Sequence, residues 1–395
     1  MWIFIRPLDT VFCRDGRPFI AGEGTVAKSI FPPMPSTFYG AIRTAILAEN
    51  NKTFKGFHRQ KEPYSDLPEV GTYDHFGSLE IRGPWIATKN KVADLFRCYF
   101  PLPANLVQDK KNKRDELFTL KPDGNDISTA EVTDLCESIS LLQCPEGKIV
   151  KNPKGYLINI EGTKKILAWN ESISFEDDLK SSDIFFKMSY QIGLARKFGA
   201  RTAEEGKLYS AGHYQTASFS KDLPGFMLRV KGTGNLPERG ILKLGGESRA
   251  AVYEIIKDRP LNEQLQDTEQ WIAKNNRFFL WLLTPAIFPH GYLPSFIDQA
   301  SMKGKLSGIN LRLAACRLGR KQYIGGFKME KGSGGSSKNG HRAVPSGSVY
   351  FFEIVNKPNQ EEINTLVKER MFGTIDGQID NMAKQGFGTT LIGGY

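Results

Sequence analysis

The chain has 395 residues, a length that predicts two domains or three, and 40% of its residues are hydrophobic. Lys and Arg number 53 against 43 Asp and Glu, which leaves a net charge of +10. The composition excludes a disordered tail, because the chain can bury a core. The cationic surplus favours a polyanionic partner, with an ordinary solvated surface as the alternative.

Several absences predict a cytoplasmic protein. The first residues lack the basic and apolar regions of a signal peptide, and the most apolar run, 278–286, is too short to span a membrane. No CxxC pair or other metal-ligand spacing occurs, so we expect no metal, no cofactor and no membrane partner. The cysteines are scattered and odd in number: Cys13, Cys98, Cys136, Cys144 and Cys316.

The first elements are a strand at 2–8, a turn at Asp15-Gly16 and a helix that begins at Pro35-Ser36-Thr37. Asn50-Asn51 ends this helix. A glycine inside a helix costs about 1 kcal/mol relative to alanine. We therefore expect Gly40 to mark the close approach of another backbone.

The middle of the chain predicts two hairpins separated by an insertion. The first hairpin has strands at 77–88 and 92–100, and the second covers 155–170 with a turn at Glu161-Gly162. The insertion, about 101–153, is polar and irregular except for a helix expected at 128–142. Residues 175–182 predict a loop, and the Gly-rich, charged segment 196–222 predicts a mobile arm.

A second cycle of strands and helices follows. The run at 278–283 is apolar throughout, as in a strand covered on both faces. Together the halves predict an α+β fold with two domains, 1–222 and 223–395, each an antiparallel sheet with helices on one face. The other expected elements are strands at 226–230, 240–244, 249–256, 310–316 and 348–355, helices at 261–275 and 359–371, and a flexible loop at 332–340.

The glycine cluster near the C-terminus is the strongest local signal. Glycines let a backbone approach a ligand closely and turn N–H groups toward phosphate. A tight turn before a terminal strand explains the same glycines equally well. The candidate RNA-contacting residues here are Gly386, Gly388, Thr389, Thr390, Gly393 and Gly394.

A second candidate region combines arginines, prolines and aromatic rings near the N-terminus. Arginine forks suit phosphate and base edges, and aromatic faces stack on unpaired bases. The alternative is a turn followed by a core helix. The candidate residues are Arg14, Arg17, Phe31, Ser36 and Arg43.

Basic residues on glycine-punctuated segments extend the candidate surface. Arg196, Lys197 and Arg201 lie on the expected arm, which could order along a nucleic-acid strand, although a solvated loop is the alternative. Arg249 and Lys328 belong to smaller basic clusters. For catalysis the candidates are few, and His213, beside Tyr214, is the best general base for RNA cleavage.

Seven segments in this order resemble the RAMP superfamily of CRISPR proteins, and within it the type III-B (Cmr complex) group that caps the crRNA 5′ end. The proline-rich helix start, the Ala-Val-Pro-x-Gly-Ser-Val-Tyr-Phe run and the glycine-rich terminus are specific in combination. The segments are 9–19, 31–43, 193–209, 284–286, 323–327, 343–352 and 386–394.

The resemblance implies two ferredoxin-like (RRM-like) domains with insertions, and no enzymatic activity in this subunit. It implies binding of the crRNA 5′ tag, and contact with the large HD/polymerase-like subunit and the first backbone RAMP subunit. It also implies an RNA-backbone contact at 386–394 and a hairpin at about 193–222 that crosses the duplex of guide and target RNA. The insertion at 101–153 matches no family motif.

Two other functions stay open. One is a metal-independent RAMP endoribonuclease that processes precursor crRNA, with His213 or Tyr214 deprotonating a 2′-OH. The other is a structural adaptor whose basic charge is incidental.

Overall fold

The structure is a computed structural model. It describes residues 1–14, 26–59, 62–72, 75–111, 116–122, 139–144, 146–169, 173–197, 199, 202–217, 222–257, 268–328 and 336–395. The expected turn at Asp15-Gly16 lies outside these residues. No helix in the described ranges is both long enough and apolar enough to cross a membrane.

The chain divides into two compact units, and each is assembled from three separate stretches. A division at residue 222 does not separate the units, because strands on both sides of that residue pair in one sheet. Unit 1 comprises Met1–Phe96, Asp183–Asp258 and Tyr323–His341, and unit 2 comprises Arg97–Ser182, Arg259–Gln322 and Arg342–Tyr395.

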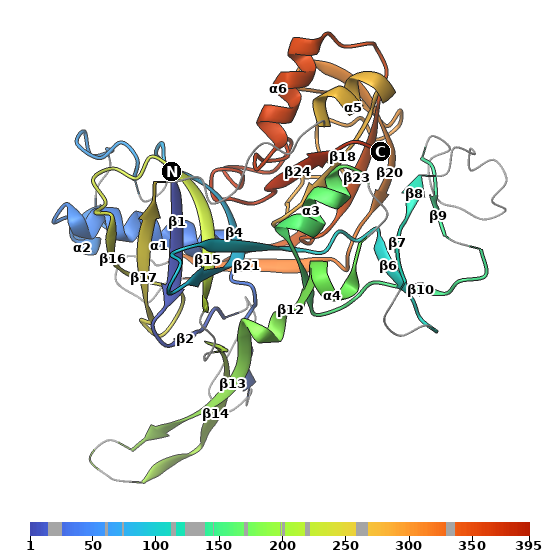
Figure 1. The fold of residues 1–395 in the computed structure, drawn as a ribbon. Helices are drawn as coiled ribbons and strands as arrows, with labels where there is room; N and C mark the ends of the chain where they lie inside the picture. Colours follow the sequence, from blue (N-terminus) through green and yellow to red (C-terminus); the bar gives the residue numbers. More distant parts are fainter. Residues whose placement is uncertain are drawn as a thin grey trace. The chain divides into compact units, whose positions relative to one another are not determined.

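The sheet of unit 1 is built around β1 (Trp2–Pro7), whose first residues are buried. It pairs antiparallel with β15 (Asp222–Lys231) and β17 (Ala250–Ile256). β4 (Glu80–Asn90) lies beyond β15, and β16 (Arg239–Lys243) lies beyond β17 (Figure 1). The remaining helices and short strands of this unit are α1 (Pro35–Glu49), α2 (Phe54–Arg59), β2 (Thr10–Val11) and β3 (Val26–Ala27).

Helix α1 confirms the helix predicted at Pro35. Proline occupies the first turn, where its missing N–H costs nothing, and the face with Phe38, Ile42 and Ile46 is buried. The expectation for Gly40 was wrong: it is exposed, and no atom lies within 4 Å of the position its Cβ would take.

The main sheet of unit 2 has the strand order β19-β20-β23-β18-β24. The apolar run predicted as a covered strand is β18, which lies between β23 and β24 with Phe278 through Leu282 buried. The bounds are β18 (Arg277–Leu282), β19 (Lys303–Leu306), β20 (Ile309–Arg317), β23 (Val349–Ile354), β24 (Thr390–Gly393), α5 (Thr268–Asn275) and α6 (Gln360–Arg370).

Four strands of each sheet lie in the same spatial order, but the two units differ in which connecting helix is present. Strands β1, β4, β15 and β17 lie in the spatial order of a βαββαβ unit, and β18, β20, β23 and β24 repeat it. Unit 1 has the first helix, α1, but β16 replaces the second. Unit 2 has the second helix, α6, while 283–308 contain β19 and no helix in place of the first. The structure is a mix of helices and mostly antiparallel sheets, which agrees with the α+β prediction at this level; two ferredoxin-like domains stay a prediction.

The hairpin predicted at 155–170 was wrong. β11 (Tyr156–Asn159) leads directly into α3 (Ile160–Leu167), because the Asn159 side chain accepts a hydrogen bond from the Gly162 N–H and caps the helix. Gly162 is needed there for packing, since a Cβ would lie 2.7 Å from Asp178 Cβ. The loop expected at 175–182 contains α4 (Phe175–Asp178) and β12 (Leu179–Ser181).

The insertion contributes short strands to unit 2. Residues 123–138, which hold most of the helix expected at 128–142, lie outside the described residues, and 139–142 are not helical. The strands are β6 (Leu106–Asp109), β7 (Leu117–Thr119), β8 (Lys121–Pro122), β9 (Leu142–Gln143) and β10 (Val150–Lys151). β5 (Phe96–Pro101) precedes the insertion and corresponds to the strand predicted at 92–100.

Two further strand pairs complete the fold. After a 3-10 turn (Ser182–Ile184), β13 (Phe186–Arg196) and β14 (Ala203–Thr216) form a long antiparallel ribbon, called the arm here. The expected mobile arm is therefore a regular strand pair over most of its length. β21 (Gln322–Lys328) pairs with β22 (Ser336–Ala343). Of the flexible loop expected at 332–340, residues 336–340 belong to β22 and 332–335 lie outside the described residues.

Candidate nucleic-acid interface

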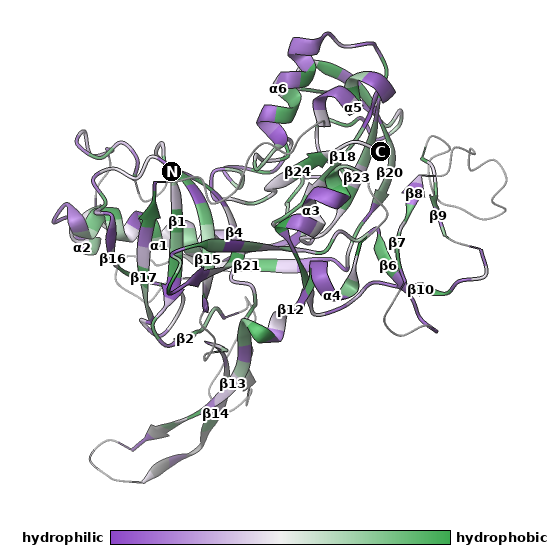
Figure 2. Ribbon diagram, viewed as in Figure 1, coloured by the Kyte–Doolittle hydropathy of each residue, from purple (hydrophilic) through white to green (hydrophobic). Residues whose placement is uncertain are grey.

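The arm carries an apolar face that lacks cover along most of its length. Alternate residues of β13 point to one side of the ribbon, and the register sets Leu194 opposite Leu208. Hydrophobic and hydrophilic residues interleave along both strands, which extend from unit 1 as a ribbon (Figures 1 and 2). Five large apolar side chains of this face are exposed: Met188, Tyr190, Ile192, Leu194 and Leu208.

Glycine opposite tyrosine shapes the ribbon on both faces. Gly193 pairs with Tyr209, and a Cβ on Gly193 would lie 2.2 Å from the Tyr209 ring. Gly212 pairs with Tyr190, whose ring would lie 3.5 Å from an added Cβ. Each tyrosine therefore lies across its partner strand. A side chain larger than that of glycine at position 193 would prevent this arrangement for Tyr209.

At its root the apolar face merges with the core of unit 1. Phe186 of β13 stacks on Phe226 of β15, and Phe31 stacks on Tyr214 of β14 with ring centroids 4.3 Å apart. Phe31 also contacts Phe186 at 5.0 Å. Phe31 was expected to stack on RNA bases, but in this structure its neighbours are aromatic rings of the chain itself.

Arg249 fastens the arm root to the body of unit 1. It donates hydrogen bonds to Gln191 of β13 at 2.8 Å, to Glu247 at 3.3 Å and to Asp9. Asp9 follows β1, and Glu247 lies between β16 and β17. The guanidinium thus faces two carboxylates and an amide of the chain itself, and a contact of Arg249 with RNA stays a prediction.

His213 is the buried centre of the same root. Its Nδ1 lies 3.1 Å from Thr10 Oγ1, its ring stacks on Phe12 at 4.7 Å, and its Nε2 is 3.6 Å from a Glu247 oxygen without a hydrogen bond. Burial lowers the pKa of His213, although Glu247 opposes the shift. The ring is inaccessible to a substrate in this arrangement, so its geometry does not suit the general base expected from sequence.

The N-terminal candidates separate into different environments. Arg43 of α1 donates from Nε to Val70 O at 2.7 Å and from Nη2 to Thr72 O, and its guanidinium lies 4.8 Å from the Phe57 ring centre. These contacts are local and structural. Ser36 is partly exposed in the first turn of α1. Arg14 is exposed, and its backbone forms an isolated antiparallel β-bridge with Ser29. Arg17 lies outside the described residues.

The glycine-rich C-terminal segment is buried, and its amides are engaged within the chain. The N–H groups of Gly388, Thr389 and Thr390 donate to Pro285 O, Thr284 Oγ1 and Gly373 O at 2.7, 2.8 and 3.0 Å. Gly386 N–H donates to Ala383 O at 3.1 Å. These amides therefore donate within the chain in this structure, and an RNA contact of the segment stays a prediction.

The last two glycines make room for aromatic rings instead of a ligand. A Cβ on Gly393 would lie 2.5 Å from the Phe279 ring, and one on Gly394 would lie 2.2 Å from the Trp271 ring. Both residues are buried beside β18 and α5. The close approach predicted from glycine is real, but the partner is the protein's own core.

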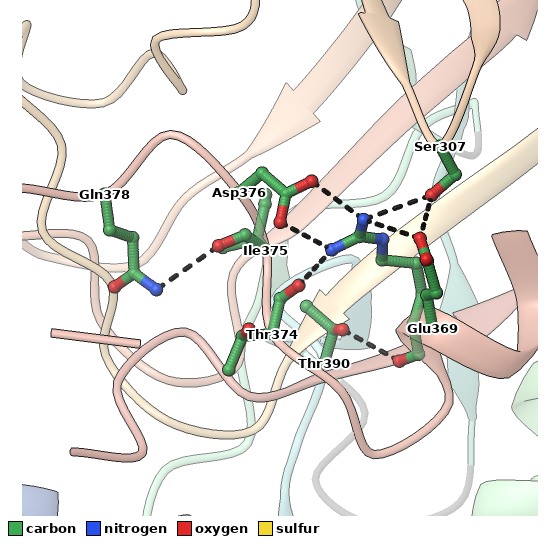
Figure 3. A network of polar contacts seen from close by, with 8 residues as sticks. Ser307, Glu369, Thr374, Ile375, Asp376, Gln378 and Thr390 are labelled. Atoms are coloured by element: carbon green, nitrogen blue, oxygen red, sulfur yellow. Dashed lines mark hydrogen bonds and ion pairs between the residues drawn. The ribbon is translucent and has the colours of Figure 1, made fainter. Parts of the chain in front are cut away.

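A buried arginine that sequence reasoning missed holds the turn before this segment. Arg370, at the end of α6, donates to both oxygens of Asp376 at 2.9 and 2.8 Å, to Ser307 Oγ at 3.1 Å and to Thr374 O. Ser307 in turn donates to Glu369 at 2.6 Å (Figure 3). The polarity of Arg370 and its position at a helix end gave no sign in the sequence that its guanidinium would be buried.

The remaining basic candidates lie at strand ends. Arg196 and Lys197 are exposed where β13 ends, and Arg201 lies outside the described residues. Lys328 ends β21, and its side chain is outside the described set. Within the described ranges, no group of three or more His, Cys, Asp or Glu side chains could hold a metal ion.

These features define a class of protein: a mixed α/β chain with two repeated antiparallel sheets and a long ribbon whose exposed face is apolar and whose far end is cationic. The particular family follows from comparison with known families. The chain belongs to the CRISPR-associated protein (Cas_Cmr3) family, whose model matches residues 3–395. The resemblance noted from the sequence is thereby confirmed.

Two of the solved structures that are similar to the chain are described here, and no curated protein matches it. Both are cryo-EM structures of type III-B Cmr-beta bound to cognate target RNA, one of them also with AMPPnP. Each is 17% identical over 89% of this chain and 86% of the matched chain, with TM-scores of 0.48 and 0.46.

Proposed function

We propose that this protein is a non-catalytic RNA-binding subunit of a type III-B CRISPR effector. In that role it holds the crRNA 5′ tag and joins the large HD/polymerase-like subunit to the first backbone RAMP subunit. Family membership supports the effector role. The observation that carries the RNA contact is the arm, with exposed Tyr190, Ile192 and Leu194 on one face and Arg196 and Lys197 at its far end.

The arm suits the duplex that guide and target RNA form. Apolar wedges unstack bases at a step, and flanking cations neutralise phosphates. The arm's apolar side chains project from a ribbon fastened at its root by Arg249 and by pairing of β14 with β2 and β3. A ribbon fixed in this way presents the face without first having to order it.

Recognition of the tag is tested by binding. Purified full-length chain is titrated with fluorescent single-stranded RNA that carries the 5′ tag of its own crRNA, and with the same RNA carrying a scrambled tag. We expect tighter binding of the true tag, because base-edge contacts distinguish sequences. Equal affinity for both RNAs would remove tag recognition from the proposal.

The arm is tested by replacing Ile192 and Leu208 with serine in one variant. We expect weaker binding of a guide–target duplex and no loss of thermal stability, because both side chains are exposed. The matched control replaces Ile241, which is exposed on β16, with serine. Unchanged duplex affinity in the arm variant would contradict the role of the apolar face.

The endoribonuclease alternative gains no support from the site. His213 is buried beside Thr10 and Phe12, and burial raises the pKa of Tyr214, which makes its phenolate scarcer. We expect no cleavage of repeat RNA incubated with the protein in the absence of metal. Cleavage that His213→Ala abolishes would reinstate the enzyme.

A further inference from the structure

Positive charge is concentrated in residues 317–343, which comprise the strand pair β21–β22, the residues between its strands and the residues that lead into it. Residues 317–343 contain seven Lys and Arg and one Glu, a surplus of six in a chain whose total surplus is ten. The chain's cationic character therefore depends more on this stretch than on the arm. A concentration of one sign of charge marks a surface for a polyanion.

The backbone of this strand pair is unusually accessible. Gly325, Gly326 and Gly340 are exposed, and no atom lies within 4 Å of the position that a Gly340 Cβ would take. Lys338 is exposed, and its aliphatic stem lies over Gly326 of the neighbouring strand, 3.2 Å from an added Cβ. Glycine thus lets a lysine lie across the ribbon and leaves bare backbone for a strand of nucleic acid to approach.

The side chains favour nucleic acid over protein as the partner. Among the described side chains of β21 and β22, Tyr323 is the only large apolar one that is exposed, at 63%, and Ile324 is buried. Protein interfaces have an apolar, charge-depleted centre, which the described part of this ribbon lacks. A single exposed aromatic ring among cations is the arrangement that binds unpaired bases through stacking and phosphates through charge.

We propose that β21–β22 is a second RNA-binding arm, which binds the backbone of single-stranded RNA without regard to its sequence. Lys338 neutralises a phosphate, and Tyr323 offers a face to one unpaired base. This goes beyond the proposed function, because the contact is independent of the tag and of the β13–β14 arm.

The lysine is tested in the full-length chain by Lys338→Gln. The affinity for single-stranded RNA of arbitrary sequence is measured between about 50 and 200 mM salt. We expect the slope of log K against log salt to become shallower by about 0.7, which is the contribution of one phosphate contact on a single strand. The matched control, Lys305→Gln, removes the same charge from an exposed position on β19. Slopes equal in the two variants would overturn the proposal.

The aromatic contact is tested by Tyr323→Leu. We expect single-stranded RNA to bind about fivefold or more weakly and fully duplex RNA to bind unchanged, because only unpaired bases stack. Equal losses for both RNAs, or no loss for either, would overturn the role of Tyr323. Thermal melting of each variant verifies that the fold is intact.

The outcome is separable from that of the tag experiment. The β21–β22 variants are expected to bind true-tag RNA and scrambled-tag RNA more weakly by the same factor. Any preference of the protein for the true tag should be preserved. Loss of the preference itself would place these residues in the tag site and overturn an independent arm. Failure of the wild-type chain to prefer its tag would count against the proposed function alone.

Discussion

Arg370 shows how a single buried side chain organises a loop that looked functional from sequence. The residue is 5% exposed, and its guanidinium bonds Asp376, Ser307 and Thr374 in and around the turn that precedes the glycine cluster. Without the guanidinium, Thr374 O would lose a hydrogen-bond donor, whereas the Asp376 carboxylate, which is about half exposed, would stay hydrated.

We expect Arg370→Ala to cost about 2 kcal/mol and to lower the melting temperature by a few degrees, because hydrogen bonds and the packing of a buried side chain are lost. The measurement is thermal unfolding followed by circular dichroism. Lys368→Ala, exposed in the same last turn of α6, is the control and should change stability little. Equal melting of the two variants would show that the guanidinium contacts contribute nothing net.

At Gly40 we expect a substitution to stabilise the protein. Gly40 occupies an exposed position inside α1 with a helical backbone and open space where a Cβ would lie. We expect Gly40→Ala to stabilise the protein by about 1 kcal/mol, because alanine loses less backbone entropy on folding. A lower melting temperature would reveal a neighbour that the described contacts do not include.

His213 predicts a pH dependence. Burial holds the pKa of His213 below the ordinary value near 6.5, so the unfolded chain takes up a proton before the folded chain does. Stability is therefore lost as the pH falls through about 6.5. We expect the melting temperature of the wild type to fall further between about pH 7.5 and pH 5.5 than that of the His213→Gln variant. His290→Gln, exposed in unit 2, is the control and should behave as wild type.

At the scale of elements, local signals decided which predictions succeeded. The proline in the first turn of α1 and the Asn359–Glu362 capping box of α6 are local signals, and both helices were predicted. Helix α3 was missed because Glu161-Gly162 was interpreted as a turn, although Asn159 is an equally good N-cap. The apolar positions Ile166 and Leu167 within the same segment are the signal that could have found it.

The candidate site was harder to predict than the fold, because residue type does not specify the partner. Glycine predicts close approach, but Gly393 and Gly394 approach Phe279 and Trp271 instead of phosphate. Arginine predicts bonding to oxygen, but Arg43 and Arg249 bond oxygens of their own unit. Burial and pairing depend on tertiary contacts that local patterns do not contain.

The arm offers a prediction at the same scale. Because Tyr209 lies flat across Gly193, we expect Gly193→Val to displace the ring and loosen the pairing of β13 with β14. Hydrogen exchange of the arm amides should then be faster, while amides of β18 and β23 keep their protection. Gly340→Val, with open space around the added side chain, is the control and should leave arm exchange unchanged.

For the whole molecule, electrostatics predicts the salt dependence of RNA binding. If the tag contact neutralises about five phosphates of a single strand, log K should fall with log salt at a slope of roughly −3.5. The net charge of +10 makes such a contact feasible. Measured by fluorescence anisotropy at several salt concentrations, a slope near zero would contradict binding through phosphates.

The interleaving of the two units limits how this protein can be divided. Each unit draws on three stretches of chain, and strands from before residue 8 and after residue 221 pair in one sheet. No single cut therefore releases either unit whole, and expressing the two halves of the gene separately would yield two fragments with unpaired strand edges. For the same reason, recombination between related genes can exchange whole copies of this protein far more readily than half of one.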